Sequence, residues 1–87
     1  SEVMAAPFHL RSLQALEMAV RCGSFVKAAE ELGITPAAVG QRVKALEDYL
    51  GVPMLLRTRG GICPTPALDQ AMPALSHAFA DLEQAME

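Results

Sequence analysis

The segment Gly33-Ile34-Thr35-Pro36 limits the fold more than any other feature of this sequence. Thr35 is suited to cap a helix, and Pro36 fits the first helical position because its missing N–H needs no partner there. Gly33 is suited to end the preceding helix, and Ile34 is placed to pack on Val39 as a hydrophobic staple. The segment therefore predicts two helices joined by a tight turn, the second starting with little fraying.

Apolar residues at steps of three and four predict three helices in the first 50 residues. The first helix covers residues 9–21, the second follows Ser24 as its N-cap, and the third ends at Gly51, ahead of Pro53. Their apolar faces are Leu10, Leu13, Leu16 and Val20; Phe25, Ala28, Ala29 and Leu32; and Val39, Val43, Leu46 and Leu50.

A β-hairpin is expected after the third helix. Residues 54–57 and 62–63 are predicted to be short strands on either side of the turn formed by residues 58–61. Because an isolated two-stranded hairpin is at best marginally stable, this one is expected to lean on the helices as a wing.

Thr65-Pro66 repeats the helix-start signal and predicts a helix that runs to the C-terminus. Its apolar stripe steps alternately by four and three and consists of Leu68, Met72, Leu75, Phe79, Leu82 and Met86. This heptad spacing favours packing against another helix, and a second copy of the chain is the expected partner. Core packing within the same chain is the alternative. Pro73 falls on the opposite side of the helix, where it can bend the axis without touching the stripe.

These elements together predict a mostly α fold: a winged helix-turn-helix with three helices and a two-stranded wing, followed by a long helix. The predicted domains are a winged helix-turn-helix DNA-binding domain over residues 8–65 and a linker or dimerisation helix over residues 66–87.

The charge is unevenly distributed along the chain, which has a net charge of −3. Residues 35–61 carry Arg42, Lys44, Arg57 and Arg59 against only Glu47 and Asp48, whereas residues 62–87 carry four acids and no base. A localised positive surface is what a DNA-binding domain requires, although the negative total is unusual for one.

The outward face of the third helix is the candidate DNA-reading surface. Ala37, Gln41 and Lys44 lie opposite its buried stripe, so the backbone can approach the groove and Gln41 can read a base edge. Thr35 and the helix N-terminus can bind a phosphate, and Arg42 and Lys44 can contact the DNA backbone. The alternative is an ordinary solvated face.

Two wing arginines, Arg57 and Arg59, lie beside a pair of glycines and can follow a phosphate chain or enter a minor groove. The alternative is an ion pair between Arg57 and Glu47 or Asp48.

Other chemistry is not expected from this sequence. His9, His77, Cys22 and Cys63 lack metal-ligand spacing, and no nucleophile has an evident base, so we predict no metal site, no cofactor and no catalysis. No apolar run is long enough to span a membrane, and the first residues lack the pattern of a secretory signal. A cytoplasmic protein is expected.

Between residues 13 and 65 the sequence resembles the N-terminal domain of LysR-type transcription regulators. The matching residues are Leu13, Leu16, Gly23-Ser24-Phe25, Ala28-Ala29, Leu32, Thr35-Pro36-Ala37-Ala38-Val39, Val43, Leu46-Glu47, Leu50-Gly51, Leu55, Arg57 and Thr65. The segment 35–47 is most similar to the branch typified by the glycine-cleavage activator.

This resemblance implies a sequence-specific DNA-binding domain, antiparallel pairing of the last helices in a homodimer, and a separate domain that binds a small-molecule effector. The residues that it implies face DNA are Thr35, Pro36, Ala37, Gln41, Arg42, Lys44, Arg57 and Arg59. The alternative function is a winged-helix dimerisation or protein-interaction module that has lost DNA binding, as the net charge of −3 would permit.

Overall fold

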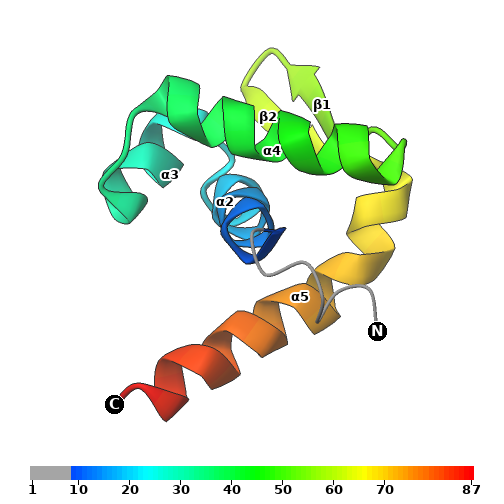
Figure 1. Ribbon diagram of the computed structural model, residues 1–87. Helices are drawn as coiled ribbons and strands as arrows, with labels where there is room; N and C mark the ends of the chain where they lie inside the picture. The colour runs from blue at the N-terminus through cyan, green and yellow to red at the C-terminus, as the bar shows by residue number, and fades with distance from the viewer. Residues whose placement is uncertain (1–8) are drawn as a thin grey trace.

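The computed structural model describes residues 9–87, which form four helices and one β-hairpin (Figure 1). The elements are α2 (His9–Cys22), α3 (Phe25–Leu32), α4 (Pro36–Leu50), β1 (Leu55–Thr58), β2 (Gly61–Pro64) and α5 (Pro66–Ala85). The predicted mostly α winged helix-turn-helix with a long last helix is confirmed. Residue 8, the predicted start of the DNA-binding domain, lies outside the described residues. The same holds for the first residues, for which no secretory signal was predicted.

The predicted caps begin and end the helices. Ser24 Oγ accepts the N–H of Lys27 at the start of α3, and Thr35 Oγ1 accepts the N–H of Ala38 at the start of α4. Gly33 and Gly51 end these helices with φ values of 67° and 70°, a left-handed conformation that glycine adopts without steric cost.

The core lies where α2, α3 and α4 meet and where the first turn of α5 closes over them. It consists of Ala15, Leu16, Ala19, Ala28, Ala29, Val39, Val43, Leu46 and Leu68. Its many alanines let the helices approach closely, and Leu16 and Val39 are its largest fully buried side chains. Leu10 and Leu50 were predicted to lie on buried faces, but they are 51% and 47% exposed because they lie at helix ends that the other elements do not cover.

The hairpin is longer and its turn tighter than predicted. β1 and β2 pair antiparallel from Leu55 opposite Pro64 to Thr58 opposite Gly61, so only Arg59 and Gly60 remain in the turn. The N–H of Ile62 donates to the carbonyl oxygen of Gly23 at 3.3 Å, which attaches the wing to the end of α2.

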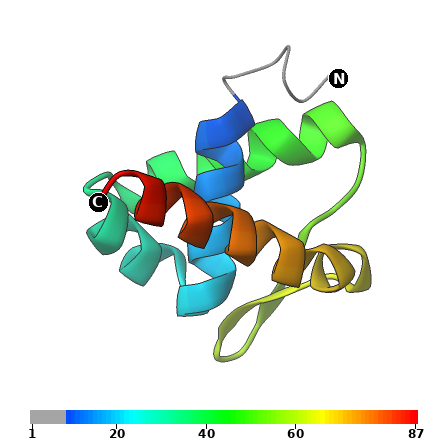
Figure 2. The same ribbon diagram turned by 90° about the horizontal axis from the view of Figure 1, so that it is seen from below.

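α4 and α5 lie on opposite sides of α2. Figure 1 shows α4 on one side of α2 and α5 on the other, and Figure 2 shows α5 crossing α2 with α4 behind it. Pro73 lies inside α5, where its missing N–H removes one helical hydrogen bond and allows the axis to bend. No helix in residues 9–87 is long and apolar enough to cross a membrane.

Candidate nucleic-acid interface

The start of α4 is an exposed helix N-terminus. Thr35 is the N-cap with extended backbone, Pro36 occupies the first turn, and both residues are exposed. Pro36 has no N–H, and Thr35 Oγ1 accepts the N–H of Ala38, so the helix dipole is what makes this end attractive to an anion such as a phosphate.

The exposed face of α4 carries three of the predicted DNA-facing residues side by side. Ala37, Gln41 and Lys44 are exposed and follow one another at helical steps of four and three, opposite the buried Val39, Val43 and Leu46. Arg42 is half-buried and lies on a flank of the helix, so it does not share this face.

Lys44 is paired on this face. Its Nζ lies 3.2 Å from Oδ1 of Asp48, one turn further along the helix, and both side chains are well exposed. An exposed pair of this kind is weak, so Lys44 can exchange Asp48 for a phosphate at little cost.

The wing places Arg57 over the ring of Phe25. The guanidinium carbon of Arg57 lies 5.7 Å from the ring centroid, within the range of a cation–π contact. Phe25 is at the start of α3, and its ring is also the nearest neighbour of the position where a Cβ on Gly40 would lie. Phe25 therefore links α4 to the wing and supports Arg57, a role that its place in an apolar helical pattern did not reveal.

The alternative ion pair of Arg57 is not formed. Glu47 instead accepts the N–H of Met54 at 2.7 Å and that of Leu55 at 3.4 Å, which fixes the start of β1 against α4, and Asp48 is paired with Lys44. Arg57 therefore stays available to an external partner.

An open cavity of about 430 Å³ lies between α4 and the wing. Of the eight predicted DNA-facing residues, Ala37, Gln41, Lys44 and Arg57 line it together, whereas Thr35, Pro36, Arg42 and Arg59 do not. Arg59 is exposed in the tight turn at the tip of the wing. The fold thus brings a helix face with a polar amide and two cations from different elements to one concave surface.

The wing position depends on the absence of a side chain at Gly61. This residue has a φ of 140°, and a Cβ built on it would overlap the carbonyl oxygen of Gly23. We expect Gly61→Ala to push the wing off α2 and to lower the free energy of unfolding by about 1–3 kcal/mol. Urea denaturation would measure this loss, with Gly60→Ala as the matched control, since a Cβ there meets open space. Equal stability of the two variants would contradict this view of the wing.

The stripe predicted to pair with a second copy is divided by the structure. Leu68 is only 3% exposed in the core of its own chain, and Met72 and Leu75 pack against that core. The first half of the stripe is therefore intramolecular packing, the alternative considered above. Leu82 and Met86 are 48% and 87% exposed.

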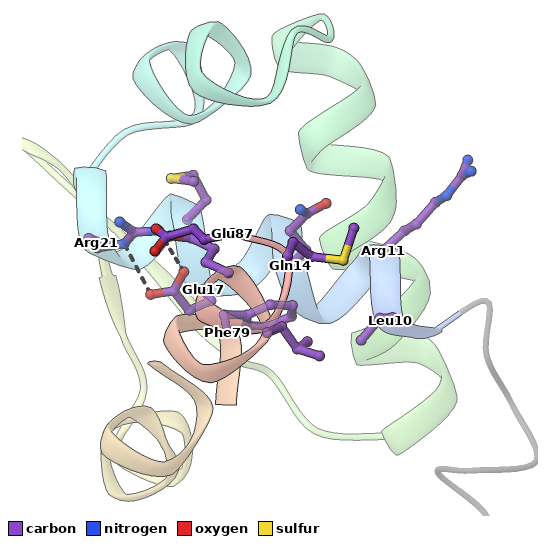
Figure 3. A pocket seen from close by; sticks show the side chains of 11 residues that line it. Leu10, Arg11, Gln14, Glu17, Arg21, Phe79 and Glu87 are labelled. Carbon is purple, nitrogen blue, oxygen red and sulfur yellow. Dashed lines mark hydrogen bonds and ion pairs between the residues drawn. The ribbon is translucent and has the colours of Figure 1, made fainter. Parts of the chain in front are cut away.

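A groove of about 540 Å³ runs between α2 and the second half of α5 (Figure 3). Leu10 and Met18 line it from α2, and Phe79, Leu82 and Met86 line it from α5. Arg21 binds Glu17 at its edge through two hydrogen bonds. Hydrogen bonding to Glu17, more than any other contact, raises the pKa of Arg21.

No group of three or more His, Cys, Asp or Glu side chains within residues 9–87 is arranged to hold a metal ion. The cysteines Cys22 and Cys63 are both free thiols.

Residues 10–67 match the family described as bacterial regulatory helix-turn-helix protein, lysR family. Among sequence relatives, the activator AmpR of Rhodobacter capsulatus is 42% identical over 78 residues, which are 90% of this chain and 27% of that protein. The regulator CbbR of Xanthobacter flavus is 37% identical over 86 residues, 95% of this chain and 26% of that protein. The chain thus spans about a quarter of the length of these relatives.

Solved structures share the fold. The BenM DNA-binding domain in complex with benA site 1 DNA has a TM-score of 0.78 at 27% identity, covering 88% of this chain and 86% of that one. OxyR of Corynebacterium glutamicum has a TM-score of 0.80 at 27% identity, covering 88% of this chain and 25% of that one. Because the family match extends over well more than half of the sequence, the chain belongs to the lysR family of bacterial regulatory helix-turn-helix proteins.

Proposed function

We propose that this chain is the sequence-specific DNA-binding domain of a bacterial transcription regulator. In this proposal α4 enters the major groove, with Gln41 at the base edges, while Thr35, Pro36, Ala37, Arg42 and Lys44 lie against the groove wall and backbone. Arg57 and Arg59 bind the backbone or the minor groove. The predicted division into a DNA-binding domain over residues 8–65 and a linker helix over residues 66–87 is part of the proposal.

One observation carries the proposal: Gln41, Lys44 and Arg57, which come from the helix and from the wing, line the same open cavity. The positive charges of Lys44 and Arg57 suit a polyanion such as DNA. The similar BenM domain was solved with DNA, which supports the same use of the fold.

Binding to a duplex of mixed sequence, followed by fluorescence anisotropy across a salt series, tests the proposal. We expect binding that weakens steeply as salt rises, because phosphate contacts release counterions. Absence of binding at low salt would favour the alternative module that has lost DNA binding.

Asp48→Asn is expected to tighten duplex binding by about two- to fivefold at low salt. The change removes the carboxylate that holds Lys44 and one negative charge beside the proposed DNA surface. The same anisotropy titration measures it, with Glu83→Gln as the control, because Glu83 lines the groove between α2 and α5. An equal gain in both variants would mean that only the net charge matters.

We further propose that two copies pair through the second half of α5. Phe79, Leu82 and Met86 form its available apolar surface, and Leu10 extends that surface across the groove. Sedimentation equilibrium of the chain without DNA tests this proposal, and a monomer at all concentrations would contradict it.

The relatives are about four times as long as the matched region, which supports a larger regulator with an effector-binding domain beyond this chain. We propose a cytoplasmic, non-enzymatic regulator. Its place in the branch of the glycine-cleavage activator stays a prediction from the segment 35–47.

A further inference from the structure

We propose that Glu17 is a positioning residue: its buried carboxylate, acting through the hydroxyl of Ser76, fixes the direction in which the second half of α5 leaves the body formed by α2, α3 and α4.

The Glu17 side chain is held in one orientation. It is only 4% exposed, and its two oxygens accept hydrogen bonds from Nη2 and Nε of Arg21 at 3.0 and 3.1 Å (Figure 3). A buried carboxylate is costly unless it is hydrogen-bonded, and a two-pronged guanidinium contact fixes the plane of the carboxylate. Glu17 is thus a rigid acceptor on α2.

Ser76 uses this acceptor. Its Oγ donates to Oε2 of Glu17 at 3.0 Å, a contact between residues 59 positions apart that joins α5 to α2. Leu68, Met72 and Leu75 hold the first half of α5 by apolar packing, and Ser76 follows directly after the last of them. Beyond Ser76 the helix borders the open groove, where apolar packing is loose. The hydrogen bond is therefore placed where the helix leaves the body.

Pro73 makes the direction of the helix depend on this contact. It lies three residues before Ser76 and cannot donate a hydrogen bond to the carbonyl of Asp69, so the helix bends easily there. Because the helix bends easily at Pro73, the hydrogen bond between Ser76 and Glu17 can select a single orientation for the second half of α5. In a paired regulator this orientation would set the distance between the two α4 helices, a consequence that rests on the proposed function.

The test compares Ser76→Thr with Ser76→Val in the full chain by NMR, without DNA. These two side chains have the same shape and differ only in the hydroxyl that reaches Glu17. Residual dipolar couplings of backbone amides report whether residues 77–85 keep a fixed direction relative to α2, α3 and α4. In the wild-type and threonine chains we expect one alignment tensor to fit both parts.

In the valine chain we expect the couplings of residues 77–85 to depart from that tensor. Their amides should also exchange with solvent at least roughly tenfold faster, as loss of a hydrogen bond to a charged group implies. Gln70→Ala, an exposed substitution on α5, should behave like the wild type. One tensor for the whole valine chain, with unchanged exchange, would overturn the proposal. Because no DNA is present, this outcome is independent of whether the domain binds DNA.

Discussion

Replacing Arg57 and Arg59 together by alanine is expected to weaken duplex binding by at least about a hundredfold at low salt. A hydrogen bond to a charged group contributes roughly 1.5–3 kcal/mol, and the two guanidinium groups are proposed to make such contacts from the same wing. Loss of two phosphate contacts should also lower the slope of log affinity against log salt by about two. Anisotropy titrations over a salt series measure both quantities.

The matched control for each single arginine is Arg11→Ala. Arg11 is exposed, lines the groove between α2 and α5, and in Figure 3 points away from the other labelled side chains. The substitution removes the same charge from a residue that does not line the cavity between α4 and the wing. If Arg11→Ala weakened binding as much as Arg57→Ala, the effect would come from net charge, and the wing would have no special role.

Leu16→Ala is expected to lower the free energy of unfolding by about 2–5 kcal/mol. Leu16 is 1% exposed at the centre of the core, where its side chain fills the space between alanines that cannot expand to replace it. A domain of this size has only a small reserve of stability, and each kcal/mol shifts its melting temperature by roughly 4–8 °C. Circular dichroism during thermal and urea denaturation measures the loss.

Leu10→Ala is the control for this change. It removes the same atoms from the same helix, but Leu10 is 51% exposed, so its loss should stay below about 1 kcal/mol. If both variants lost the same stability, the core would not be centred on Leu16.

The helices and caps were predictable because their signals are local. Ser24, Thr35, Gly33 and Gly51 act on backbone groups within a few residues, and the apolar periods identify the buried faces of α2, α3 and α4. The same apolar periods also identify the exposed face of α4. The prediction that Ala37, Gln41 and Lys44 share this face therefore agrees with the structure, in which all three line one cavity.

Contacts between elements were not predictable in this way. The ring of Phe25 under Arg57 and the carboxylate of Glu47 at the start of β1 depend on how the wing packs against the helices. The periodic stripe of α5 did not distinguish packing against its own chain from packing against a second copy, and Leu68 proved to be core. The bond between Glu17 and Ser76 joins distant positions that no spacing rule connects.

The most direct test of the central claim is an amide NMR titration of the chain with duplex DNA at low salt. We expect shifts concentrated in residues 35–44 and 57–61, which weaken as salt is added, with the far side of α2 and the second half of α5 unaffected. No shifts in those segments at high DNA excess would contradict the claim that α4 and the wing form a DNA-binding surface.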